Sequence, residues 1–181
     1  MRQGKSINTL TAGRFWPLDP RQEEIQAQDI AHSLSMLCRA NGHYRHFFSV
    51  AQHSLYCADE ARARGLSRRV QLACLLHDAS EAYTGDLTRP IKASMPAFEQ
   101  MEAPLQQCIY ATYGLADLTA EELAQVGAID DAMLGYEMAQ LLNHHELITE
   151  PLQQDYDLSF RMMDQVRDAF LARLQQLLPS P

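Results

Sequence analysis

The chain has 181 residues, of which 46% are hydrophobic and 21% charged, and it carries a formal net charge of −8. This length fits a single domain that can fold without disulfide bonds, and the composition is that of a globular protein. The acidic balance argues against nucleic acid or an anionic membrane as a partner. It still permits an anionic small substrate, because a metal ion and a few arginines can reverse the sign inside a cleft.

The four cysteines form no C-x-x-C pair, which argues against a zinc knuckle or a thioredoxin-type site. Three of the four fall on apolar helical faces and are predicted to be small core residues. The sequence has no pattern typical of a secretory signal and no apolar run long enough to span a membrane, so we expect a cytoplasmic protein.

The first elements are an N-terminal arm and a short helix. Residues 1–25 lack helical periodicity and are expected to form an irregular arm or a hairpin that turns at Gly13. A helix is predicted over residues 29–40, and it ends at Asn41-Gly42. Arg39 falls in its last turn, where it could cap the helix or bind a phosphate.

Three helices are predicted in the middle of the chain. The capping box Ser49–Gln52 starts a helix that runs to about residue 64, and the next runs from about 67 to 85. Residues 86–90 are expected to be a loop, because a proline disfavours the α conformation in the residue before it. A further helix over 97–113 is interrupted by Pro104, which predicts a kink or two shorter helices.

Two more helices complete the prediction of an all-α fold. The capping box Thr119–Glu122 begins a helix that ends near His144-His145, and these histidines suit its negative end. Asp130 and Glu137 interrupt the apolar stripe of this helix. Residues 155–181 are expected to carry a C-terminal packing helix, from about residue 158 to residue 178, which could also pack against a second copy of the chain in a homodimer.

The stretch from residue 72 to residue 92 is the most informative part of the sequence. At helical spacing, His77 and Glu81 continue the face of Val70, Ala73 and Cys74, which is apolar. Burying polar groups is costly unless they are paired, and a divalent metal is a suitable partner for an imidazole beside a carboxylate. The alternative is an ordinary helix end with a hydrogen-bonded histidine and solvated acids.

Metal-ligand side chains occur on three of the predicted helices, all on inward-facing positions. They are His53, His77 with Asp78, and Asp130. Two imidazoles and two carboxylates can hold one divalent ion and leave positions open for water and substrate. A packed helical bundle could hold such side chains rigidly.

This ordered H…HD…D pattern resembles the HD-domain superfamily of metal-dependent phosphohydrolases. The matching motifs are Val50-Ala-Gln-His53-Ser54, His77-Asp78 and Ile129-Asp130-Asp-Ala-Met-Leu-Gly-Tyr-Glu137. The run His77-Asp-Ala-Ser-Glu-Ala-Tyr-Thr-Gly-Asp86 is similar to the bacterial 5′-deoxyribonucleotidase branch and its prophage-encoded relatives. The resemblance covers about residues 25–142 and implies one all-α HD-type bundle over residues 1–181.

The resemblance also implies roles for individual residues. It implies that the metal ligands are His53, His77, Asp78 and Asp130. It makes Glu81 and Asp78 the catalytic residues, with Glu81 orienting or activating the attacking water. Asp130 is preferred to Asp131 because the family's apolar pair and its glutamate fit the register from Asp130. By the same resemblance, Arg39 binds the substrate phosphate and Asp86 a sugar hydroxyl.

The implied function is hydrolysis of a nucleotide, most simply a (deoxy)nucleoside 5′-monophosphate. A cyclic or polyphosphorylated nucleotide, or a non-catalytic nucleotide-binding regulatory role, remains open. The dinuclear enzymes of the superfamily carry additional histidines between the second and the last motif, whereas residues 79–129 contain none. The resemblance therefore implies one divalent ion, whether Mn, Co, Fe, Ni, Zn or Mg. Ala40 stands where the deoxyribonucleotidases have tryptophan, which leaves substrate choice open. Other phosphate contacts could come from four residues, which are His43, His46, Arg89 and Lys92.

Overall fold

The computed structural model describes residues 2–11, 13–148 and 150–179, and it confirms an all-α fold with one small hairpin. The α-helices are α1 (Ala27–Met36), α2 (Val50–Ala63), α3 (Arg68–Leu76), α4 (Glu81–Thr84), α5 (Arg89–Ala93), α6 (Pro96–Thr112), α7 (Ala120–Leu142) and α8 (Met163–Leu177). The 3₁₀ helices are η1 (Gln22–Glu24), η2 (Arg39–Gly42) and η3 (His145–Leu147).

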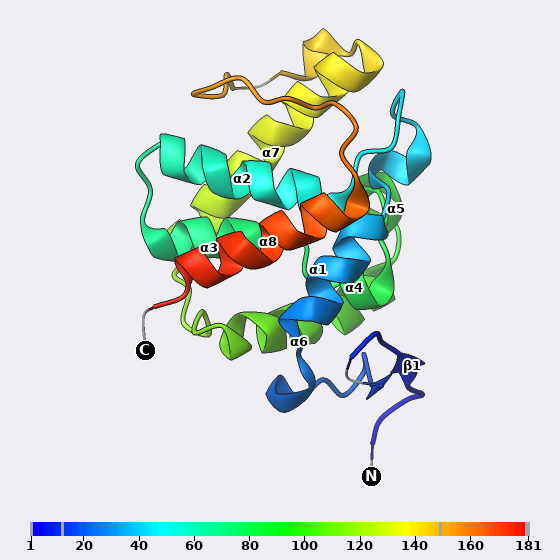
Figure 1. Cartoon of the computed structure of the whole chain (residues 1–181). Coiled ribbons are helices and arrows are strands. Elements are labelled where there is room, and N and C mark those ends of the chain that lie inside the picture. Colours follow the sequence, from blue (N-terminus) through cyan, green and yellow to red (C-terminus); the bar gives the residue numbers. More distant parts are fainter. Residues whose placement is uncertain (1, 12, 149, 180–181) are drawn as a thin grey trace.

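Helix α2 lies at the centre of the bundle. It packs most extensively against α3 and also contacts α1, α7 and α8, while α8 lies along α1. In Figure 1, α2 and α8 cross the front of the molecule and α7 passes behind them. Most residues of α2 are buried, and among them the side chain of His53 is fully buried, so it is held away from solvent on all sides.

Local capping signals fix the start of the two longest site-bearing helices. Ser49 Oγ accepts a hydrogen bond from the backbone N–H of Gln52, at 3.1 Å, and starts α2. The Gln52 side chain does not return the bond but donates to Tyr56 and to the backbone of Ser159. At Thr119 both bonds of the predicted capping box are present.

Helix α7 lies close to the segment that follows it. A Cβ atom on Gly135 would lie 2.5 Å from the backbone oxygen of Leu147, so only glycine lets η3 pack this closely. The helix ends at Leu142, with Asn143 in a left-handed conformation. The two histidines predicted for its last turn therefore lie beyond it, and one of them, His144, pairs with Glu146 at 2.9 Å.

The predicted helix over 29–40 is too long. Helix α1 ends at Met36, and the chain then extends so that Cys38 bridges to Ser49 and Arg39 N–H donates to Phe48 O. Three consecutive residues of η2, at positions 40–42, have positive φ angles of 52°, 50° and 77°. Arg39 therefore does not cap α1, because long-range backbone hydrogen bonds draw it away from that helix.

The predicted helix over 67–85 is also wrong, because it is divided at the most informative stretch. Helix α3 ends at Leu76, residues 77–80 form turns, and α4 begins at Glu81. The Gln106 side chain bonds the backbone on both sides of the break, accepting from Ser80 N–H and donating to Leu76 O. These bonds satisfy backbone groups that a continuous helix would have paired internally.

The prediction of a loop over residues 86–90 is correct for 86–88 only. Helix α5 begins at Arg89, with Pro90 in the first turn, where a backbone N–H has no intrahelical partner. Of the two alternatives predicted at Pro104, two shorter helices are excluded, because α6 continues through this residue. The last helix starts at Met163 rather than 158, because Glu60 holds the preceding extended segment through Gln153 N–H and Tyr156 Oη.

The N-terminal hairpin is confirmed. Ile7–Asn8 pairs antiparallel with Arg14–Phe15, and Gly13 has a φ of 76° at the turn. Phe15 is fully buried and stacks on Tyr83 at a centroid distance of 4.1 Å, which joins the arm to α4. None of the helices in the described ranges combines the length and apolarity needed to cross a bilayer.

Candidate metal centre

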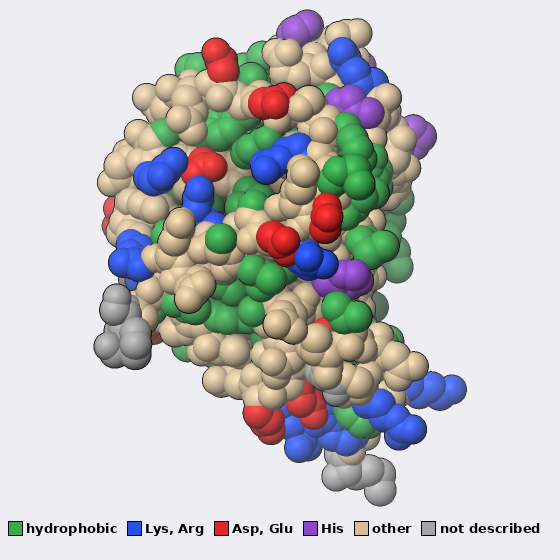
Figure 2. Space-filling model, in the orientation of Figure 1, with side chains coloured by type: hydrophobic (Ala, Val, Ile, Leu, Met, Phe, Trp, Pro, Cys, Tyr) green, Lys and Arg blue, Asp and Glu red, His purple; other side chains and the backbone are tan. Residues whose placement is uncertain are grey.

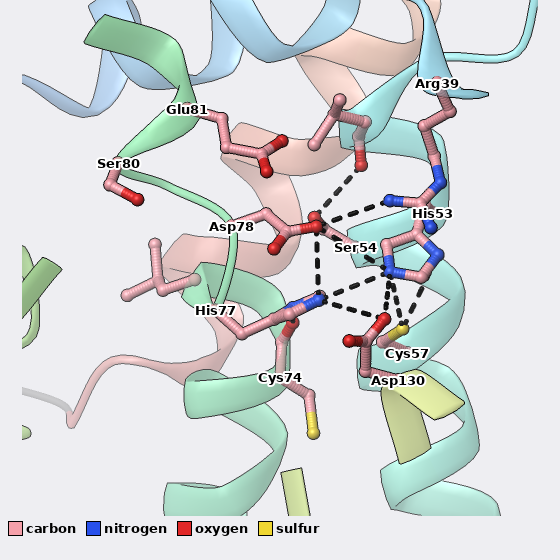
Figure 3. A network of polar contacts seen from close by, with 12 residues as sticks. Arg39, His53, Ser54, Cys57, Cys74, His77, Asp78, Ser80, Glu81 and Asp130 are labelled. Atoms are coloured by element: carbon pink, nitrogen blue, oxygen red, sulfur yellow. Dashed lines mark hydrogen bonds and ion pairs between the residues drawn. The ribbon is translucent and has the colours of Figure 1, made fainter. Parts of the chain in front are cut away.

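Four nitrogen and oxygen atoms of metal-ligand type converge where α2, the end of α3 and α7 meet (Figure 3). His53 Nε2 lies 3.3 Å from His77 Nε2 and 3.1 Å from Asp130 Oδ1. His77 Nε2 lies 3.3 Å from Asp78 Oδ2 and 3.6 Å from Asp130 Oδ1. Ligands about 2.1 Å from a tetrahedral metal stand ~3.4 Å apart, so the spacing of these atoms fits one metal ion.

Hydrogen bonds to the opposite ring nitrogen orient both imidazoles. His53 Nδ1 lies 2.6 Å from Glu137 Oε1, and His77 Nδ1 lies 2.7 Å from the backbone oxygen of Cys74. With a proton on each Nδ1, the lone pair of each Nε2 is directed to the cluster. Burial alone would lower the pKa of His77, but the Asp78 and Asp130 carboxylates outweigh it and raise this pKa well above its usual value.

The two aspartates of the cluster are each held by an arginine. Asp78 Oδ2 lies 3.4 Å from Arg39 Nη1, and Asp130 Oδ2 lies 2.6 Å from Arg89 Nη2. Burial opposes their ionisation, but the two histidines outweigh it and lower the pKa of both carboxyl groups. The side chain of Asp131 is 58% exposed, compared with 22% for Asp130, and it contacts Arg89 outside the cluster.

Glu137 is a fully buried residue that the sequence motif used only to set the register of Asp130, with no role in the site predicted for it. Besides its bond to His53, it accepts from Arg39 Nε at 3.0 Å and from Tyr44 Oη at 3.1 Å. Burial would raise its pKa, but the positive charges of Arg39 and His53 lower it below the usual range. The available signal was an acidic residue on the apolar stripe of α7, about two turns beyond Asp130.

A pocket of about 310 Å³ lies over the cluster and brings together five of the residues predicted for the site. These five are Arg39, Asp78, Glu81, Asp86 and Asp130. Arg89 and Lys92 also line it, whereas the lining does not include His43 or His46. The lining also includes five apolar residues, which are Ala40, Leu87, Pro90, Leu134 and Met138. The pocket is therefore lined by both charged and apolar residues.

Glu81 lies on α4 beside Asp78, and the two side chains extend in the same direction toward Arg39 and His53 (Figure 3). Its Oε1 lies 3.2 Å from Lys92 Nζ, while Oε2 is buried and has no hydrogen-bond partner among the described residues. Burial, followed by the negative charges of Asp78 and Asp86, raises the pKa of Glu81 to about 9. A cation in the cluster would oppose this shift.

Cys57 offers an alternative ligand. Its Sγ lies 3.4 Å from His53 Nε2, and the ligand atoms of His53, Cys57 and His77 lie within 4.8 Å of one another. Burial, with the nearby charge of Asp130, raises the pKa of the Cys57 thiol well above its usual value. Because a metal binds the thiolate, the ionised aspartates are the more favourable donors.

Residues 34–140 match the model of a protein family described as HD domain, a range that contains all four residues of the cluster and Glu137. The chain belongs to the HD domain family. This match confirms the superfamily predicted from the sequence. HD domains bind divalent metals, and the family is generally one of hydrolases. The 5′-deoxyribonucleotidase branch remains a prediction.

The chain is also similar to two uncharacterized bacterial proteins. The chain is 36% identical to the uncharacterized protein YfdR of Escherichia coli (strain K12) over 109 residues, which cover 60% of this chain and 58% of YfdR. Less than two thirds of that relative is therefore spanned. This chain is also 33% identical to an uncharacterized protein of Rhodobacter capsulatus, RCAP_rcc00048, over 185 residues, which cover 94% of each chain.

Proposed function

We propose that this HD domain is a phosphohydrolase that binds one divalent metal ion and hydrolyses nucleoside 5′-monophosphates. The metal ligands would be His53 Nε2, His77 Nε2, Asp78 Oδ2 and Asp130 Oδ1. The observation that supports this most strongly is the convergence of these four atoms beside a pocket that also contains Glu81 and three cationic side chains. A purely structural ion would need neither the pocket nor the acid.

The chain's own residues prepare the site for this chemistry. When bound, a divalent ion supplies positive charge that polarises a phosphoryl oxygen and lowers the pKa of the attacking water. Glu137 and the Cys74 carbonyl hold the imidazoles in one tautomer, while Arg39 and Arg89 fix the two aspartates. This pre-organisation means that few side chains need to reorient during the reaction.

Glu81 would transfer the proton. Its Oε2 would accept a proton from the attacking water, and its Oε1 is held by Lys92. A positioned acid or base of this kind contributes on the order of 10²- to 10⁴-fold to the rate. With Lys92 and Arg39 nearby but no metal ion, the pKa of about 9 favours the neutral acid, so the base form would depend on the added charge of a divalent cation.

The mixed lining of the pocket supports a nucleoside monophosphate as the substrate. Arg39 and Arg89 line it and would bind the phosphate, although both already contact carboxylates. Asp86, which lines the same pocket, would accept a hydrogen bond from a sugar hydroxyl and repel a second phosphate. The apolar lining residues would contact the base without hydrogen-bond readout, so we expect tolerance among bases.

The test is phosphate release by purified protein with Mn²⁺ or Co²⁺. The substrates are 5′-mono-, 3′-mono-, tri- and cyclic phosphates of ribo- and deoxyribonucleosides, and 5′-monophosphates should react fastest. Glu81→Ala should keep its metal and lose on the order of 10²-fold or more in kcat, whereas Glu121→Ala, at an exposed glutamate of α7, should react normally.

Three results would argue against the proposal in different ways. A triphosphate or cyclic nucleotide that outpaces every 5′-monophosphate would overturn the substrate assignment and leave the metal site intact. Wild-type-like turnover by metal-loaded Glu81→Ala would remove its proposed role. Stoichiometric metal with no phosphate release from any substrate would indicate the non-catalytic, nucleotide-binding alternative.

A further inference from the structure

The short helix α5 carries a lysine that lines the pocket and forms ion pairs with two carboxylates. Lys92 is one of only two lysines among the 181 residues, and its side chain is 22% exposed. Its Nζ lies 3.2 Å from Glu81 Oε1 and 3.1 Å from Glu102 Oε2. The ammonium group is therefore shared between the proposed proton-transfer residue on α4 and a carboxylate on α6.

Helix α6 fixes the position of this lysine. Glu102 Oε1 also accepts a hydrogen bond from Ser80 Oγ at 3.3 Å, so Glu102 is tied to the residue that precedes α4. Lys92 Nζ lies 5.8 Å from the ring centroid of Phe98, a favourable distance for a cation–π contact. The side chain of Lys92 is thus restrained by three residues of α4 and α6, which limits the freedom of the ammonium group.

Lys92 contacts one oxygen of the Glu81 carboxylate and leaves the other without a partner among the described residues. We propose that Lys92 is a positioning residue for the hydrolysis: it holds Glu81 Oε1 so that Oε2 remains available for proton transfer. This inference rests on the proposed phosphohydrolase function.

A different role would be direct binding of the substrate phosphate by Lys92. The two roles make opposite predictions. A positioning residue acts only through Glu81, so its loss lowers kcat and leaves KM nearly unchanged. Loss of a phosphate-binding residue would raise KM, and this effect would be the same whether or not Glu81 is present.

A double-mutant cycle separates the two roles. Lys92→Met should lower kcat on the order of 10- to 100-fold in the wild-type background, because small displacements of a catalytic group have effects of this size. In the Glu81→Gln background the same substitution should change kcat by less than about 2-fold. Lys92→Arg should restore part of the rate, and Lys5→Met, at an exposed lysine, should have no effect. Equal, multiplicative losses in the two backgrounds would overturn the inference.

A second measurement does not depend on activity. Selective ¹³C labelling of lysine leaves the ammonium group and its three N–H donors intact and gives an NMR signal of Cε for each of the two lysines. Glu81→Gln and Glu102→Gln should each shift the Lys92 signal and leave that of Lys5 in place. An unchanged Lys92 signal would overturn the contact itself. If the wild-type protein released no phosphate but the Lys92 signal moved as expected, the proposed function would fail and the contact would stand.

Discussion

Glu137 provides the most informative perturbation of the site, because it lies behind the proposed metal ligands and does not itself line the pocket. Its side chain is fully buried and joins three residues: His53 at 2.6 Å, Arg39 at 3.0 Å and Tyr44 at 3.1 Å. The substitution Glu137→Gln keeps the shape and removes the charge. The new amide NH₂ would then face at least one group that is itself a donor.

Two magnitudes follow from this arrangement. Removing one partner of a buried ion pair costs about 3–5 kcal/mol, and we expect about 3 kcal/mol here because Asp78 still compensates Arg39. Removing the carboxylate that orients a ligand histidine weakens metal binding by about 10- to 100-fold. The folded-state pKa of Glu137 is lowered, so its contribution is present above the unfolded value of about 4.3 and is lost as the pH falls through the folded pKa.

Glu60 offers a matched control. It is also a fully buried glutamate, and it accepts from Arg64 Nε at 2.8 Å and from Tyr156 Oη at 2.9 Å. Urea unfolding of the metal-free proteins at pH 7 should show that Glu137→Gln and Glu60→Gln are both clearly destabilising. Titration against a chromophoric chelator should show weaker metal binding only for Glu137→Gln. Equal metal affinity in the two variants would refute the reasoning that Glu137 acts through His53.

Further predictions concern a helix contact, the choice of aspartate and pH. Gly135→Ala should destabilise the protein by about 1–3 kcal/mol, because the new Cβ would meet a backbone oxygen. Gly127→Ala has open space around it in the same helix and should stabilise the protein by about 0.5–1 kcal/mol. Thermal unfolding of the two variants and the wild type measures both effects. Asp130→Asn should lose bound metal in elemental analysis and Asp131→Asn should keep it, and the reverse order would show that the wrong aspartate was chosen. Metal affinity should rise from about pH 6 to pH 8, because the raised pKa of His77 makes protons compete with the metal; a flat profile in isothermal titration would contradict this.

Local signals in the sequence were sufficient to predict where the helices that begin with a capping residue start. Ser49 and Thr119 each accept the predicted backbone hydrogen bond, because capping depends on residues within one turn. The order and spacing of His53, His77-Asp78 and Asp130 along the chain were sufficient to predict the family, because the family motif is defined by residues in this order. The expected positions of these side chains on inward faces agree with their convergence in the structure.

Long-range hydrogen bonds determine what the sequence could not show. The break after Leu76 depends on Gln106, about 30 residues away, which pairs with backbone groups at the break. Arg39 leaves its predicted helix because its backbone bonds Phe48, and its side chain then reaches Glu137. The periodicity of apolar residues along the chain does not reveal such contacts.

On the face shown in Figure 2, acidic and basic side chains are interspersed. The expected absence of a nucleic-acid partner remains a prediction.

Anomalous scattering from crystals of the metal-loaded protein, recorded at the absorption edge of the bound metal, tests the four-ligand centre most directly. We predict one peak, within about 2.0–2.3 Å of His53 Nε2, His77 Nε2, Asp78 Oδ2 and Asp130 Oδ1. A peak bonded to Cys57 Sγ with both aspartates outside ligand distance, or no peak at this position in protein that contains stoichiometric metal, would contradict it.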